Sequence, residues 1–243
     1  MKTTNTLIIA ILLLASTVNV QAQKWSKNKV KGNGTITTKT VAITPYNHLN
    51  VVGSMDITLV EGDETSITVT TDENVHEYVE ITSGGGVLKI SLKNVTSLST
   101  KKGIKITVPF RDLNEVSLVG SGDIQSDKRI NADIFMVSLT GSGDITLEIN
   151  SQQIDAKLTG SGDVSLKGTA TNIEIKVSGS GDFDAKNLEA DNAEAYVSGS
   201  GDATVYAKKS LKARVNGSGD ISYKGNPERV DSKVSGSGDI EKM

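Results

Sequence analysis

The sequence predicts an all-β fold, a parallel β-helix or β-solenoid with coils of about 19 residues preceded by an irregular β region. The first observation is a tetrapeptide, Gly-Ser-Gly-Asp, that occurs seven times at intervals of 18 to 21 residues. The second is a series of short runs of Val, Ile and Thr between turn residues, which is typical of strands. No stretch shows a clear helical period of about 3.6 residues. Each repeat is therefore expected to form one coil of a stack.

The first 22 residues have the features of a secretory signal peptide. Lys2 precedes an apolar run from Leu7 to Leu14, and small residues end the segment at Ala22. The run is too short to span about 30 Å of hydrocarbon. We therefore expect a mature chain that begins at Gln23, has no membrane span after signal cleavage, and is exported to the periplasm, the cell surface or the medium.

The next part of the chain divides into two segments. Residues 23–34 are polar and contain glycine, so they are expected to form a flexible lead-in. Residues 35–112 are expected to form an irregular N-terminal β region, with an acidic loop at 72–74 and a polar loop through Ser99 and Lys102. Its expected strands are 35–43, 49–52, 57–60, 66–70, 78–82, 87–92 and 104–110. A degenerate copy of the tetrapeptide begins at Gly53.

Residues 113–243 are expected to form the regular solenoid. The seven motifs begin at Gly120, Gly141, Gly160, Gly179, Gly199, Gly217 and Gly236. Apolar residues predominate two and four positions before each motif and four positions after it, so these positions share one parity and should point inward. Both motif glycines have the same parity. They should supply a positive φ at a corner or, alternatively, allow two walls to approach closely, and we favour the corner.

The opposite parity is polar and predicts surface columns in the stacked coils. Acidic residues stand five positions before the motif, at Asp155, Glu174, Glu194 and Asp231. Mostly basic residues stand three before it, at Lys157, Lys176, Tyr196, Arg214 and Lys233. Hydroxyl or amide residues stand one before it, at Thr140, Thr159, Ser178, Ser198, Asn216 and Ser235. Such columns are expected to help set the register of the coils.

The motif aspartates form a further predicted column, which allows two interpretations. They are Asp123, Asp144, Asp163, Asp182, Asp202, Asp220 and Asp239. Stacked aspartates in Gly-rich turns bind Ca²⁺ in β-rolls, but that motif repeats every nine residues. The interpretation that we favour is structural, with each carboxylate accepting main-chain N–H groups at its corner. A calcium ladder is the alternative.

The composition argues against most catalytic chemistry. The chain has no cysteine and only two histidines, His48 and His76, which are expected at the surface or at a strand edge. A thiol nucleophile is therefore excluded and a transition-metal site is not expected. Gly-Ser-Gly lacks the spacing and the histidine partner of a nucleophile elbow. We expect no enzyme, no catalytic residues, no cofactor and no resident metal. The 26 basic and 29 acidic residues are interspersed, which does not suggest a nucleic-acid partner.

Several segments together resemble the autotransporter adhesin head, GIN domain, family, whose members are common in Bacteroidetes envelopes. The resemblance involves Val51–Leu59, Gly86–Ile90, Ile104–Pro109 and the recurring Val-Ser-Gly-Ser-Gly-Asp, and it extends over residues 36–240. It implies a β-helix-like fold, export and an adhesive role, and it provides no catalytic residues.

Three functional hypotheses follow from the sequence. The first is a non-catalytic, adhesin-like binding or structural module of the cell envelope, with a cell-surface glycan or an envelope protein as its partner. The second is a structural envelope protein that associates with itself through an open end of the stack, and therefore forms a homo-oligomer. The third is a carbohydrate-active β-helix enzyme, which would need acidic and basic residues clustered in one groove.

Overall fold

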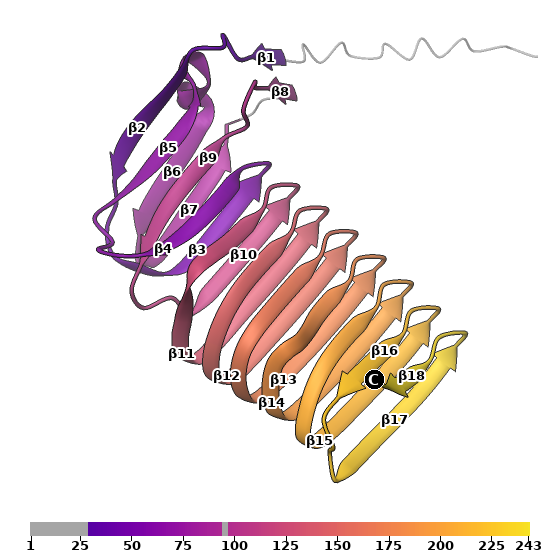
Figure 1. Ribbon diagram of the computed structural model, residues 1–243. Coiled ribbons are helices and arrows are strands. Elements are labelled where there is room, and N and C mark those ends of the chain that lie inside the picture. The colour runs from indigo at the N-terminus through magenta and orange to yellow at the C-terminus, as the bar shows by residue number, and fades with distance from the viewer. Residues whose placement is uncertain (1–28, 94–96) are drawn as a thin grey trace, which may run out of the picture.

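The computed structural model describes residues 29–93 and 97–243 of the chain. The predicted signal peptide and residues 23–28 of the predicted lead-in lie outside the described residues. The described chain is almost entirely β, and its strands stack into one elongated body (Figure 1). A β-solenoid of about seven turns with coils of about 19 residues confirms the predicted fold class.

The N-terminal region combines parallel and antiparallel pairs. β2 pairs antiparallel with β5, β5 with β9, and β6 with β7, whereas β3–β7 and β4–β9 are parallel. Its strands are β1 (Lys29–Lys31), β2 (Ile36–Ala42), β3 (Tyr46–Gly53), β4 (Asp56–Glu61), β5 (Ser66–Asp72), β6 (Val79–Gly84), β7 (Gly86–Leu92), β8 (Ser97–Ser99) and β9 (Lys105–Phe110). Each of the seven strands expected here overlaps one of these elements.

Three elements of this region differ from the loops that the sequence suggested. The acidic segment begins a 3₁₀ helix, η1 (Glu73–Tyr78), which follows β5. The polar loop contains β8, and the part of the lead-in that is described contains β1. β1 and β8 pair in parallel as a separate two-stranded sheet. β1 and β8 are held by main-chain pairing, and η1 has Val75 as its single buried residue, so these elements show little of the apolar pattern on which the prediction depended.

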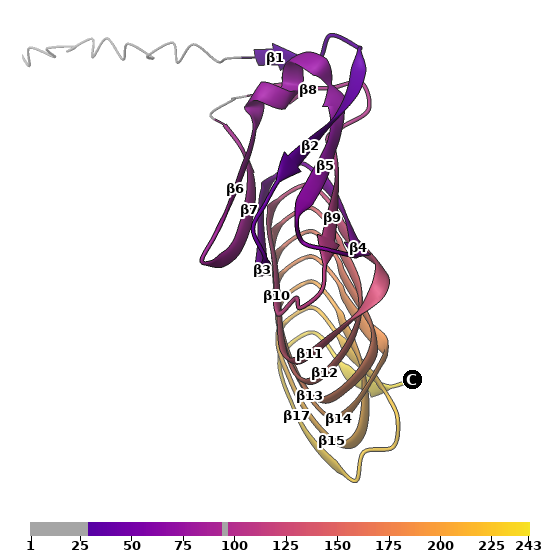
Figure 2. The ribbon, with the colours of Figure 1, turned by 90° about the vertical axis from the view of Figure 1, so that its left-hand side faces the viewer.

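The repeats form a stack of parallel coils. The strands are β10 (Glu115–Gly120), β11 (Ile124–Gly141), β12 (Ile145–Gly160), β13 (Val164–Gly179), β14 (Phe183–Gly199), β15 (Ala203–Gly217), β16 (Ile221–Lys224), β17 (Arg229–Gly236) and β18 (Ile240–Lys242). Each first motif glycine pairs with its equivalent in the next coil. Gly53 pairs with Gly120 in the same register, so the degenerate copy begins the stack. Figure 2 shows the coils one behind another.

The interior consists of the apolar positions that the repeat pattern predicted. Leu118, Leu139, Leu158, Val177, Val197 and Val215, each two positions before a motif, are all 2 % exposed or less. Phe135 and Phe183 are buried among them. The bore of the solenoid is therefore a packed core.

The motif glycines satisfy both explanations that the sequence left open. Gly160 has a φ of +128°, so the first glycine occupies the favoured corner conformation. A Cβ on Gly160 would also lie 2.1 Å from the carbonyl oxygen of Gly141, and one on Gly162 would lie 2.0 Å from that of Gly143. Successive corners are thus in main-chain contact. The first glycine of the motif requires the positive φ of the corner, and neither glycine has room for a Cβ.

Candidate functional site

The strand segments that precede the motifs present three outward columns, which together we call the polar face. The acidic column contains Glu115, Met136, Asp155, Glu174, Glu194, Lys212 and Asp231. The basic column contains Ser117, Ser138, Lys157, Lys176, Tyr196, Arg214 and Lys233. The hydroxyl column contains Val119, Thr140, Thr159, Ser178, Ser198, Asn216 and Ser235. The register therefore forms the predicted columns, with Met136 and Lys212 as departures from the acidic one.

Ion pairs join the acidic and basic columns. Lys176 Nζ lies 2.7 Å from Glu174 Oε1 in the same strand, and Arg214 Nη2 lies 2.5 Å from Asp231 Oδ2 in the next coil. The hydrogen bond to Asp231 raises the pKa of Arg214, and the same bond lowers the pKa of Asp231. Exposed pairs of this kind add little to stability, but they fix the positions of long side chains.

Tyr196 lies between two lysines in the middle of the basic column. Its hydroxyl donates to Glu194 Oε2 at 2.5 Å, and this hydrogen bond lowers the pKa of Glu194. Lys176 Nζ and Lys212 Nζ lie 5.9 and 5.4 Å from the centroid of its ring. These distances are those of cation–π contacts. Tyr196 therefore keeps two ammonium groups on the polar face, although it has no charge of its own.

A shallow hollow of about 610 Å³ follows the basic and hydroxyl columns across the last coils. Its lining includes all five members of the column from Lys157 to Lys233, together with Val177, Val197 and Val215, whose side chains belong to the core. The long side chains of this column carry aliphatic stems that end in charged groups, as lysine and arginine commonly do. The hollow can therefore offer apolar contact together with several positive charges.

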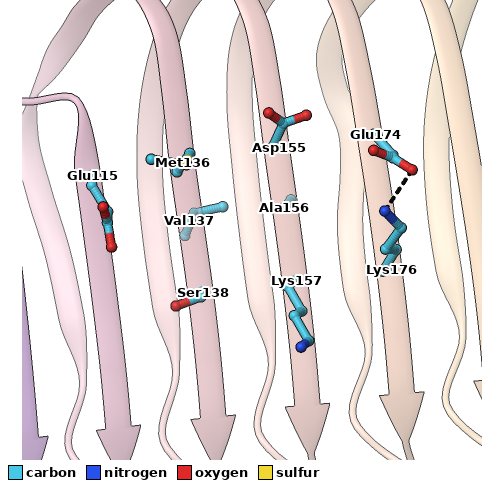
Figure 3. Close-up of a pocket in the computed structure, with 9 residues that line it drawn as sticks. All are labelled: Glu115, Met136, Val137, Ser138, Asp155, Ala156, Lys157, Glu174 and Lys176. Carbon is cyan, nitrogen blue, oxygen red and sulfur yellow. Dashed lines mark ion pairs between the residues drawn. The ribbon is translucent and has the colours of Figure 1, made fainter.

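A second hollow of about 240 Å³ continues this surface toward the N-terminal end (Figure 3). Lys157 and Lys176 line both hollows, so the two adjoin. Met136, which is 41 % exposed, occupies an acidic-column position between Glu115 and Asp155. Sequence reasoning missed this hollow. The signal that could have found it is the apolar residue that interrupts a charged column.

The motif aspartates occupy the corners, away from the strand segments that form the polar face. In each successive pair, the main-chain N–H of one aspartate donates to Oδ1 of its equivalent in the preceding coil, at 2.7 to 3.1 Å. This is the kind of contact that the structural interpretation expects. Within residues 29–93 and 97–243, no group of three or more His, Cys, Asp or Glu side chains is arranged to hold a metal ion.

The two histidines lie on separate elements of the N-terminal region. His48 in β3 places Nδ1 3.7 Å from Glu115 Oε2. His76 in η1 places Nε2 3.0 Å from Thr37 Oγ1 and 3.2 Å from the Thr37 carbonyl oxygen. Burial lowers the pKa of His76. His48 is the register equivalent of Glu115, so it adjoins the N-terminal end of the acidic column, whereas His76 belongs to η1.

The fold and the polar face together define a repeat solenoid with a charged, extended lateral surface. The chain belongs to the family described as "Putative auto-transporter adhesin, head GIN domain", whose model matches residues 45–227. This result confirms the resemblance seen in the sequence. No helix in the described ranges is long and apolar enough to cross a bilayer.

Solved structures with the same fold come from Bacteroides and Parabacteroides species. A "putative adhesin" from Bacteroides fragilis is 25 % identical, with a TM-score of 0.84 over 88 % of this chain and 100 % of that one. A "Putative lipid binding protein" from Parabacteroides distasonis is 30 % identical, with a TM-score of 0.74 over 88 % and 99 %. A "putative adhesin" from the same species is 25 % identical, with a TM-score of 0.72 over 88 % and 100 %. The comparison with curated proteins finds no match.

Proposed function

We propose that this protein is a non-catalytic, adhesin-like module of the cell envelope that binds acidic glycans along the basic column of its polar face. Membership of an adhesin family supports the general role. The signal-peptide features of residues 1–22 support export to the envelope or beyond. The choice of ligand depends on the charges and the geometry of the polar face.

The observation that supports this ligand most directly is the repetition of cationic groups along the stack. Lys157, Lys176, Arg214 and Lys233 come from four coils, and Tyr196 holds Lys212 and Lys176 in the coils beside it. Adjacent strands lie about 4.8 Å apart, so the column from Lys157 to Lys233 extends about 19 Å. A linear polymer with regularly spaced carboxylate or sulfate groups fits such a row, and the adjoining hydroxyl column can exchange hydrogen bonds with sugar hydroxyls.

The proposal is tested by binding of dextran sulfate and neutral dextran of equal length to the chain from Gln23. Dextran sulfate should bind, and its affinity should fall with added salt, whereas neutral dextran should not bind. The double variant Lys157→Ala/Lys233→Ala should weaken binding by about tenfold. The matched control Lys128→Ala/Lys167→Ala removes the same charge outside the polar face and should leave affinity unchanged. Equal effects of the two double variants would show that the polar face is not the binding site.

Two further measurements separate this role from its alternatives. One relative is described as lipid binding, so binding of the chain to vesicles of phosphatidylglycerol is measured in parallel. Binding to these vesicles but not to dextran sulfate would contradict a glycan ligand. We also expect no shortening of acidic polysaccharides during long incubation, since the proposed module is not an enzyme. Depolymerisation that persists in highly purified protein would favour the carbohydrate-active alternative.

A further inference from the structure

The C-terminal end of the stack exposes residues that are buried in every earlier coil. Val230 and Val234 of β17 occupy inward positions but are 47 % and 39 % exposed. Their equivalents in the preceding coil, Leu211 and Val215, are each 2 % exposed. In the described chain, β17 pairs with β15 along one edge and leaves its other edge unpaired (Figure 1). This end therefore combines exposed apolar residues with free main-chain hydrogen-bonding groups.

The N-terminal end of the stack, in contrast, is covered by other elements. η1 packs there against β2, β5 and β6, and its Val75 is fully buried. The outer strands of that end, β2 and β6, run antiparallel to their neighbours. A head-to-tail array would need the β17 end of one copy to match this covered end of another. Pairing of two like ends avoids that mismatch and forms a closed dimer with two-fold symmetry.

The sequence of β17 is self-complementary for such pairing. If two copies of β17 run antiparallel about a two-fold axis at Ser232, Val230 lies opposite Val234 of the other copy, and Asp231 lies opposite its Lys233. Cross-strand pairs of opposite charge and of apolar residues both stabilise antiparallel ladders. In the preceding coil the equivalents of Asp231 and Lys233 are Lys212 and Arg214, which would repel each other in the same arrangement. β12 and β13 have the same acid–base order, but both of their edges are occupied.

The direction of the main-chain groups agrees with this register. Met136 occupies the position of Asp231 in the first long coil, and its N–H points back to the preceding coil, to Asn114 O at 2.8 Å. Because main-chain groups alternate along a strand, those of Val230, Ser232 and Val234 point to the free edge of β17. These residues can therefore form the hydrogen-bonded pairs of an antiparallel ladder.

We propose that two copies of this chain associate tail to tail through an antiparallel pair of β17 strands centred on Ser232. The contact covers Val230 and Val234, and it places Asp231 beside Lys233 of the second copy. The resulting dimer extends the sheet across the symmetry axis and joins the two polar faces at their β17 ends.

Sedimentation of the chain from Gln23 between about 1 and about 100 µM tests the association. The wild-type chain should pass from monomer to dimer, and Asp231→Lys or Lys233→Asp should each weaken the dimer about tenfold or more. An equimolar mixture of the two variants should restore dimers, because opposite charges then face each other. Lys128→Asp, an exposed reversal in another coil, serves as the control. A monomer at every concentration, or a dimer that is insensitive to both reversals, overturns the proposal.

Cysteine cross-linking tests the register and does not depend on the charge reversals. The chain has no cysteine, so a single introduced one reports only its own contacts. Ser232→Cys faces itself across the axis, with Cα atoms about 5.5 Å apart, which suits a disulfide. It should form a covalent dimer under mild oxidation. Ser235→Cys would lie opposite Arg229 and should form no covalent dimer under the same oxidation. Equal cross-linking of the two variants, or none with Ser232→Cys while its circular dichroism is native, contradicts the register.

Discussion

The main-chain N–H of Asp182 donates to Oδ1 of Asp163, one coil earlier, at 2.9 Å. This contact makes the Asp163 side chain an acceptor between two corners. Two carboxylates about 5 Å apart repel by about 0.8 kcal/mol in water. A hydrogen bond to a charged group contributes about 1.5–3 kcal/mol. The attraction to the next N–H therefore exceeds the repulsion along the column, and we expect the column to be stable without a cation.

The first prediction concerns this hydrogen bond. Asp163→Ala removes the acceptor of the Asp182 N–H and also relieves the repulsion from the neighbouring carboxylates. The net loss in the free energy of unfolding should therefore be about 1 kcal/mol. Asp163→Asn retains an amide oxygen at the same place, so its loss should be smaller. Chemical denaturation of both variants measures the difference. If both lose the same amount, the carboxylate oxygen does not matter as an acceptor.

The second prediction concerns calcium. Because Oδ1 of each motif aspartate from Asp123 to Asp220 accepts an N–H from the next coil, we expect no calcium ladder. The melting temperature of the chain from Gln23 should be the same with millimolar calcium and with chelator. A ligand that binds only the folded state raises stability by mass action. A clear rise with calcium, abolished by Asp163→Asn, would restore the calcium alternative.

The third prediction concerns the second motif glycine. Gly162→Ala places a Cβ 2.0 Å from Gly143 O, far inside van der Waals contact, so the two corners must separate. We expect a loss of about 3 kcal/mol or more, or failure to fold. Gly84→Ala is the matched control, because its Cβ would meet no atom within 4 Å. A Gly162→Ala chain as stable as this control would contradict the close contact between coils.

The sequence predicted the solenoid well because its repeat and its side-chain parity are local properties. Leu118 and Val197 could be assigned to the interior from their spacing to the motif, and both are buried. η1 contains a single buried residue, Val75, so its segment has no apolar period. β8 pairs with β1, which lies far away in the sequence. Such elements depend on tertiary main-chain contacts that residue patterns do not show.

The candidate site was predictable in outline and not in detail. The order of charges within each repeat predicted the columns, since parallel strands in register align equivalent residues. Tyr196 was expected in the basic column, but its contact with Lys212 joins different columns of adjacent coils. That diagonal contact depends on the register and on the rotamers of both side chains. The hollows along the face likewise depend on packing, which the sequence alone does not specify.

The last prediction concerns the pH dependence of stability at His76. Burial lowers its pKa in the folded state from the ordinary 6.5, although its bond to the Thr37 carbonyl acts in the opposite direction. Between the two pKa values the unfolded chain binds more protons at this residue, so the contribution of His76 to stability rises with pH and is complete above about 6.5. Stability from this source is lost as the pH falls below that value.

Denaturation of the wild type and of His76→Gln at pH 5 and pH 7.5 measures this contribution. The glutamine side chain can still hydrogen bond to Thr37 but does not titrate. We expect the wild type to lose more stability than the variant as the pH falls, by a small amount because His76 is only partly buried. Nuclear magnetic resonance titration of the His76 ring gives its pKa directly. A value at or above 6.5 in the folded protein would show that burial does not dominate at this position.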